Sequence, residues 1–137
     1  MTGLNDPKIL TFLDSKEIAI LATVQADGAP LAMAMWFLHD PASLTMISEA
    51  RTQKVRNLRR DPRACVVAEA GGGGADIRGI TVQGRAEFLD DGPERRALIE
   101  RFHRKYPRLK ELWRGQAMPA DRVMFRIIPE RARSWGL

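Results

Sequence analysis

A short segment of the chain, residues 51–63, has the residue types and spacing needed to bind an anion. It contains six basic residues and one acid, Asp61, so its net charge is +5, the same as that of all 137 residues together. Arg51, Lys54 and Asn57 are spaced by three, so on a helix they lie along one side of the first turns. Unpaired backbone N–H groups at a helix start also attract negative charge. This combination suits a phosphate group.

The flanking residues define the element that presents this segment. A strand-like run at residues 44–48 leads into Thr52, a favourable N-cap residue, and Pro62 limits the following helix to about two and a half turns. The residues alone also permit a second interpretation, a solvated basic helix that buries only Val55 and Leu58. The segment therefore predicts a helix and leaves open whether that helix binds phosphate.

Side chains that perform acid–base, nucleophilic or metal chemistry are scarce. The chain has two histidines, His39 and His103, and one cysteine, Cys65. No cluster of Cys, His or Asp has the spacing of metal ligands, and no serine stands in a nucleophile context. The glycines at 71–74 fit neither the dinucleotide-binding nor the P-loop pattern and predict a hairpin loop. If the chain is an enzyme, a bound cofactor must carry its chemistry.

Hydrophobic patterning predicts one mainly β domain over residues 1–137. Short helices are expected after Asp6-Pro7, after Thr52 and after Asp91-Gly92-Pro93. About six antiparallel strands with so few helices indicate a small barrel. The runs with the composition or alternation of strands are residues 18–24, 31–38, 44–48, 64–69, 80–88 and 123–127, the last continuing as an extended tail over 131–135.

The second of these runs, residues 31–38, is apolar throughout and lacks the polar alternation of a half-exposed strand. Both of its faces must therefore be covered. Met33, Met35 and Trp36 would suit a planar aromatic ligand, because thioether and indole groups pack well against π systems. A core strand that also makes a dimer contact, with no ligand, explains the pattern equally well.

The overall composition limits where the protein is expected in the cell and what it is expected to bind. A hydrophobic content of 45% with 28% charged residues is ordinary for a soluble protein. The start of the chain lacks the layout of a signal peptide, and no apolar run is long enough to span a bilayer, so we expect a cytoplasmic protein without membrane contact. Nucleic-acid binding is not expected either, because residues 51–63 contain no aromatic side chain and match no known reader motif.

Several motifs together resemble the flavin and deazaflavin oxidoreductase superfamily, the split β-barrel group that includes the pyridoxamine 5′-phosphate oxidase-like proteins. The resemblance covers residues 18–135 and is most similar to the branch that uses the deazaflavin coenzyme F-420. The sequence after the third strand, Gln-Lys-Val-Arg-Asn-Leu-Arg-Arg-Asp-Pro-Arg at 53–63, carries it most strongly. Residues 22–30, 34–37, 78–79, 82–87 and 131–135 also match.

The resemblance implies a split β-barrel homodimer with cofactor sites shared between two subunits. It implies that Lys54 and Asn57 hold the cofactor phosphate, and that Ser48 and Arg51 complete the phosphate and ribityl contacts. The tricyclic ring would lie along the second strand and contact Met35, Trp36 and Phe37, while Arg78 and Trp135 would come from the other subunit.

In function, the resemblance implies an oxidoreductase in which F-420 transfers hydride to an electron-poor small molecule such as an enone or quinone. FMN is the alternative cofactor, because the same phosphate contacts serve both. A carrier or sensor that binds the cofactor without turnover is the alternative role. Vitamin B6 oxidation is not expected, because the chain has no extension after Trp135 of the kind that true pyridoxamine phosphate oxidases use for substrate. A haem-binding role is not expected, because neither histidine is placed as an axial ligand.

Overall fold

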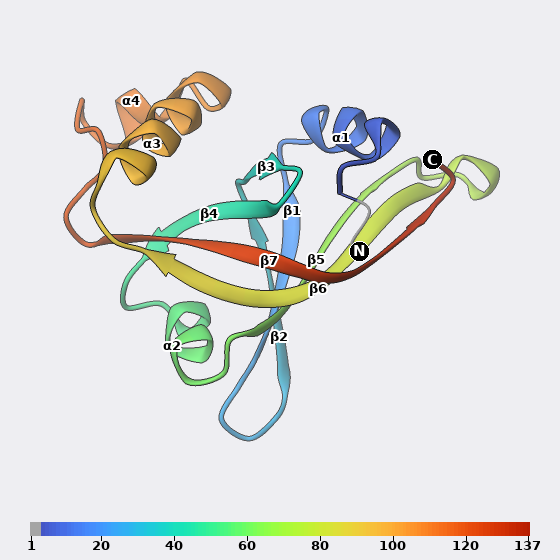
Figure 1. Ribbon diagram of the computed structural model, residues 1–137, viewed down its shortest axis with the longest axis horizontal. Coiled ribbons are helices and arrows are strands. Elements are labelled where there is room, and N and C mark those ends of the chain that lie inside the picture. The colour runs from blue at the N-terminus through green and yellow to red at the C-terminus, as the bar shows by residue number, and fades with distance from the viewer. Residues whose placement is uncertain (1–3) are drawn as a thin grey trace.

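The structure, a computed structural model, describes residues 4–137. Seven antiparallel strands form one sheet in the order β2-β1-β5-β6-β7-β4-β3. Figure 1 shows that the sheet is strongly curled. The main hydrophobic core lies inside this curl. With seven strands and only short helices, the fold is mainly β, as predicted. The strands are β1 (Ala19–Val24), β2 (Pro30–Met35), β3 (Leu38–Asp40), β4 (Ser43–Glu49), β5 (Arg63–Ala70), β6 (Arg78–Leu89) and β7 (Arg122–Trp135).

The two edge strands of this sheet, β2 and β3, are neighbours in sequence. Only Trp36 and Phe37 lie between them. Because consecutive Cα atoms are about 3.8 Å apart, two linking residues hold the ends of the edge strands within about 11 Å of each other. A flat sheet of seven strands would hold them more than twice as far apart, at about 4.8 Å per strand. The sheet must therefore curl, which produces the split-barrel shape.

The prediction of one continuous strand over residues 31–38 was wrong, which is why the sheet has seven strands instead of about six. The chain bends at Phe37, where the backbone N–H donates to the Tyr106 hydroxyl (2.9 Å) and the C=O accepts from Lys105 Nζ (2.8 Å). These bonds take Phe37 out of the sheet's hydrogen-bond ladder. Ala32, Met33 and Ala34 of β2 are exposed in the structure of residues 4–137, so the cover expected over this strand would have to come from a ligand or a second subunit.

The helices lie around the curled sheet. They are α1 (Pro7–Asp14), α2 (Gln53–Arg60), α3 (Pro93–Lys105) and α4 (Leu109–Leu112), with a 3-10 turn, η1 (Gly74–Asp76), in the glycine-rich loop. Figure 1 shows α3 and α4 together at one side of the sheet and α2 at the opposite side. Asp6 caps α1 as predicted by accepting from the Lys8 N–H (2.9 Å), and Gly28, with a φ of 89°, forms the predicted turn between β1 and β2.

Two hydrophobic clusters stabilise this arrangement. The first fills the inside of the curled sheet and includes Leu21, Phe37 and Phe125. The second joins α3 and α4 to the sheet through residues such as Phe102 and Tyr106. No helix among residues 4–137 is long and apolar enough to cross a membrane.

Candidate functional site

A cavity of about 390 Å³ opens where the bend between β2 and β3, the end of β4, the start of α2 and the short helix α4 meet. One part of its wall is apolar and aromatic, and another part carries charged side chains. Its lining residues are Ile18, Ala34, Met35, Trp36, Ile47, Ser48, Glu49, Lys54, Leu109, Leu112, Trp113 and Arg122. We call it the β4–α2 pocket.

Four of the predicted site residues line the β4–α2 pocket. Met35 and Trp36 come from the end of β2, Ser48 from β4, and Lys54 from the first turn of α2. The antiparallel sheet brings these separate parts of the chain together. The structure thus places flat apolar groups beside a basic helix start, which is the combination that a phosphorylated aromatic ligand requires.

Lys54 is the residue of the pocket whose charge and pKa are most affected by its surroundings. The residue as a whole is only 9% exposed, and its ammonium keeps access to water without a hydrogen bond or ion pair to any other group among residues 4–137. Burial lowers its pKa below the ordinary lysine value, while the negative charge of Glu49 opposes the shift. Partial loss of water disfavours the charged form of this lysine, and an anion in the pocket would offset that effect.

Tyr106, the residue that follows α3, packs against the back of the Trp36 ring. The two rings are stacked with centroids 4.5 Å apart and planes 7° apart. The Tyr106 hydroxyl also donates to the Glu17 carbonyl (2.8 Å) and accepts from the Phe37 N–H. Tyr106 therefore fixes both the backbone bend and the ring that lines the pocket.

Phe37 does not reach the β4–α2 pocket. Its side chain is fully buried in the core inside the sheet, with Lys105 Nζ 3.9 Å from the ring centre. Its backbone groups are bonded to Tyr106 and Lys105. It offers a ligand neither side chain nor backbone, so the structure gives it a supporting place below the pocket instead of the predicted ring contact.

Asn57 also lies away from the pocket, fully buried between α2 and β1. Its amide group donates to the Thr23 hydroxyl (3.0 Å) and its carbonyl oxygen accepts from Gln53 (2.7 Å). These bonds satisfy its side chain inside the chain. Asn57 therefore links α2 to β1 through its side-chain hydrogen bond to Thr23. For Asn57 to contact a phosphate as predicted, these hydrogen bonds would have to break.

Thr52 precedes α2 as predicted but does not cap it. Its hydroxyl donates to the Glu49 carbonyl (2.9 Å) and lies 3.2 Å from the Ser48 hydroxyl, and no side chain caps the helix start. The first N–H groups of α2 are therefore not used by a capping residue. These N–H groups lie beside Lys54 in the chain, Ser48 lines the same pocket, and both can add to the attraction for an anion.

The remaining predicted site residues are not in the pocket of this chain. Arg51 is exposed in the loop before α2 and does not line the cavity. Arg78 and Trp135 lie together at the opposite end of the sheet, where β6 begins and β7 ends. Within one chain they cannot complete this pocket, so their predicted role depends on a second subunit.

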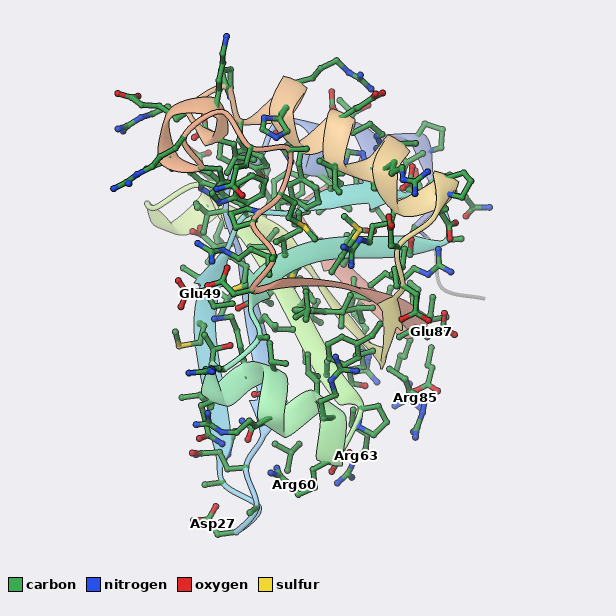
Figure 2. The ribbon with its side chains drawn as sticks, turned by 90° about the vertical axis from the view of Figure 1, so that its left-hand side faces the viewer. Asp27, Glu49, Arg60, Arg63, Arg85 and Glu87 are labelled. Atoms are coloured by element: carbon green, nitrogen blue, oxygen red, sulfur yellow. The ribbon has the colours of Figure 1, made fainter. Side chains whose placement is uncertain are left out.

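The basic residues of segment 51–63 make different contacts, and most of these lie outside the pocket. Arg63 pairs with Asp61 (2.8 Å), Arg60 donates to the Val24 carbonyl, and Arg59 lies over the Phe88 ring at 3.6 Å. Figure 2 shows Arg60 and Arg63 at the end of α2 farthest from Glu49. Most of the cluster therefore stabilises the fold, and Lys54 is the member that faces the pocket.

Sequence reasoning missed part of the pocket wall. Leu109, Leu112 and Trp113 of the α4 segment line it, and so does Arg122, which forms ion pairs with Glu49 (3.6 Å) and Asp121. The one available signal was the apolar spacing of the α4 residues, which equally fits ordinary core packing. Leu112 remains 55% exposed at the mouth of the pocket.

A second cavity of about 340 Å³ lies beside Val24, Cys65 and Gln83. Its basic residue, Arg63, is already paired with Asp61, and Cys65 lies 3.2 Å from the Thr81 hydroxyl. No charged side chain among residues 4–137 is both buried and unpaired in its lining. Among residues 4–137, no group of three metal-ligating side chains comes together in either cavity or elsewhere.

The fold and the pocket define the class. A curled antiparallel sheet, with a pocket between its edge-strand bend and a basic helix, is the split β-barrel architecture. The chain belongs to the pyridoxamine 5′-phosphate oxidase family, whose pattern its residues 6–136 match.

Solved structures support this assignment of the fold. A conserved hypothetical protein from Mycobacterium tuberculosis is 29% identical with a TM-score of 0.77, over 96% of this chain and 84% of that one. An FAD-binding protein from Mesorhizobium loti is 21% identical with a TM-score of 0.76, over 93% and 89% of the two chains. The haem storage protein HutZ from Vibrio cholerae is 19% identical with a TM-score of 0.78, over 93% and 92%. At these last two identities the likeness concerns the fold alone.

Replacing Asn57 with alanine should destabilise the chain because it leaves the buried Thr23 hydroxyl without its partner. We expect a loss of about 1–3 kcal/mol in the free energy of unfolding, measured by urea denaturation. Gln53→Ala, which removes an exposed partner of the same amide, should cost less than about 1 kcal/mol. Equal stability of wild type and Asn57→Ala would contradict the structural role.

The pH dependence of stability should reveal Lys105, because burial lowers its pKa from 10.5 to about 8. Between these values the unfolded chain binds more protons than the folded one, so the Lys105 contribution to stability rises with pH. Subtracting the unfolding free energy of Lys105→Met from that of wild type should give a difference that grows between about pH 7.5 and about pH 9.5. A flat difference would contradict the assignment. Tyr106, with its pKa raised to about 12, acts only above this window.

Proposed function

We propose that the β4–α2 pocket binds a phosphorylated flavin-type cofactor, with the deazaflavin F-420 as the preferred one, and that the chain is an oxidoreductase acting on an electron-poor small molecule. The observation that carries the proposal is Lys54, a largely buried lysine beside the Met35 and Trp36 wall whose ammonium has no partner among residues 4–137. Membership of the pyridoxamine 5′-phosphate oxidase family supports a flavin-type ligand. The motif at residues 53–63 favours the F-420 branch.

The residues of the chain fit such a cofactor. Lys54 would donate to the phosphate, with the Ser48 hydroxyl and the uncapped start of α2 beside it. Met35 and Trp36 would lie against the ring, and Tyr106 behind Trp36 keeps that surface rigid. When bound in its reduced form, the cofactor supplies a hydride. Leu112 and Trp113 would exclude water from the ring.

Few side chains that line the pocket could act as a general acid or base. No histidine lines it: His39 lines a different cavity, and His103 Nε2 lies 2.7 Å from the Ala117 carbonyl oxygen. A proton needed by the product would therefore come from solvent. The missing histidine also argues against haem as the ligand, although a structural neighbour is a haem storage protein.

A second copy of the chain would complete the site. The outer face of β1 and β2 exposes apolar side chains, among them Ile20, Ala32 and Ala34, which in a single chain contact water. A partner packed there would cover them and could bring its own Arg78 and Trp135 to the pocket. The protein is therefore proposed to be a homodimer with two shared sites.

Lys54→Ala should weaken cofactor binding by about 1.5–3 kcal/mol, roughly tenfold to a hundredfold, because it removes a charge-assisted hydrogen bond. Fluorescence titrations with oxidised F-420 and with FMN measure this and show which ring is preferred. Arg59→Ala, whose guanidinium lies over Phe88 instead of the pocket, is the matched control and should change affinity much less.

Two results would contradict this proposal. Wild-type protein that binds neither cofactor at tens of micromolar would exclude the proposed ligand class. Equal weakening by Lys54→Ala and Arg59→Ala would show that α2 provides only a diffuse positive field. Tight binding without oxidation of the reduced cofactor by any acceptor in a panel would instead indicate a carrier.

An Ala32→Arg substitution should prevent dimer formation, because it places a charge on the outer face of β2, which lies at the edge of the sheet. Light scattering coupled to size-exclusion chromatography should give a dimer for wild type and a monomer for the variant. Ala26→Arg, at the exposed turn between β1 and β2, should remain dimeric. A monomeric wild type, or a dimeric Ala32→Arg, would contradict the shared site.

A further inference from the structure

We propose that Glu49 makes the β4–α2 pocket selective for a singly charged phosphodiester over a doubly charged phosphate monoester. The inference rests on the proposed function, because it names the class of phosphate that Lys54 receives. It assigns a role to a residue that the sequence did not single out.

The charges that line the pocket are few and can be counted. Lys54 and Arg122 are positive and Glu49 is negative, so two positive charges minus one negative charge leave a net charge of +1. Arg122 is already engaged, because its guanidinium lies 3.6 Å from a Glu49 carboxylate oxygen and is also paired with Asp121. Lys54 is therefore the one cation lining the pocket that has no counter-ion among residues 4–137.

Glu49 is placed to act on a ligand at Lys54. It is the last residue of β4 and precedes α2 by only three residues, and its charge raises the pKa of Lys54 against the effect of burial. Figure 2 shows it at the end of β4, above α2 and on the side of the molecule where β2 runs. An anion held by Lys54 would therefore share the pocket with this carboxylate.

The number of charges on the phosphate then decides how well it fits. A phosphodiester keeps one negative charge, which Lys54 balances. A monoester carries about 1.5 to 2 negative charges at pH 7, since its second proton leaves near pH 6. The second charge of the monoester finds no free cation in the pocket, because Glu49 already engages Arg122. Neutralising Glu49 would leave Arg122 freer to meet that second charge. Arg51 does not line the cavity, so its charge is not among those that face the ligand.

A purely structural role for Glu49 predicts something different. Glu49 is paired with Arg122 across the β4–β7 ladder, and that ion pair alone would stabilise the end of the sheet. Because Glu49 is 61% exposed, such a pair contributes little to stability. A structural role would alter the affinities for both phosphate classes equally, whereas a selective role alters their ratio.

The test compares two ligands that differ by one charge: a riboflavin 5′-phosphate and its methyl ester, each also made with a deazaflavin ring. Binding is measured at about pH 8 by fluorescence for wild type, Glu49→Gln and the control Glu69→Gln, an exposed carboxylate on β5. Removing one charge from the lining of a solvated pocket should shift the affinity ratio about threefold to tenfold toward the monoester. Glu69→Gln should leave the ratio unchanged.

The outcomes separate the two proposals. An unchanged ratio in Glu49→Gln, or the same shift in Glu69→Gln, would overturn the selective role while the cofactor site stands. Failure of wild type to bind either ligand in both ring series would overturn the proposed function and this inference with it. The wild-type ratio should also approach one at about pH 5.5, where the monoester regains its second proton, and a ratio that does not depend on pH would count against the charge explanation.

Discussion

The short connection between the two edge strands is the constraint on which the rest of the structure depends. With only Trp36 and Phe37 between β2 and β3, the sheet has to curl until its edges meet. The side chains of these two residues point in different directions. Phe37 is buried in the core, and Trp36 faces the pocket with Tyr106 stacked behind it. The closure of the barrel and the ring surface of the candidate site are therefore produced by one bend, which α3 holds through Tyr106 and Lys105.

The curled sheet also determines where charge can be buried. It brings the end of β4 and the start of α2 beside the bend, so that Lys54 is enclosed by apolar walls while Glu49 and Arg122 stand at the same opening. Partial burial of this ammonium lowers its pKa, because the charged form loses part of its hydration. An anion in the pocket would favour the charged form again, which is why Lys54 is central to the proposed site.

Much of this fold could be predicted from the sequence because it depends on local rules. Alternating side chains identified β6 and β7, Asp6-Pro7 marked the start of α1, and Asp27-Gly28 marked the turn after β1. The break in the second strand could not be predicted, because it depends on Tyr106, a residue 69 positions away from Phe37. An apolar run of eight residues shows that burial is needed and does not show which residue leaves the ladder.

The site was predictable only in part for the same reason. Motif resemblance located Met35, Trp36, Ser48 and Lys54, and the structure brings these four together. Spacing by three placed Asn57 on the same side of α2 as Lys54, but how deep each side chain lies depends on the packing of the helix against β1. The contributions of α4 and Arg122 arise from tertiary contacts that leave no local pattern.

The central claim is that Lys54 holds the phosphate of a ring-bearing cofactor in the β4–α2 pocket. A crystal structure of the protein with its cofactor, F-420 or FMN, tests this most directly. The claim predicts a phosphate oxygen within hydrogen-bond distance of Lys54 Nζ, about 2.7–3.2 Å, and the ring against Met35 and Trp36. A cofactor bound in the cavity beside Cys65, or one whose phosphate lies away from Lys54, would contradict it.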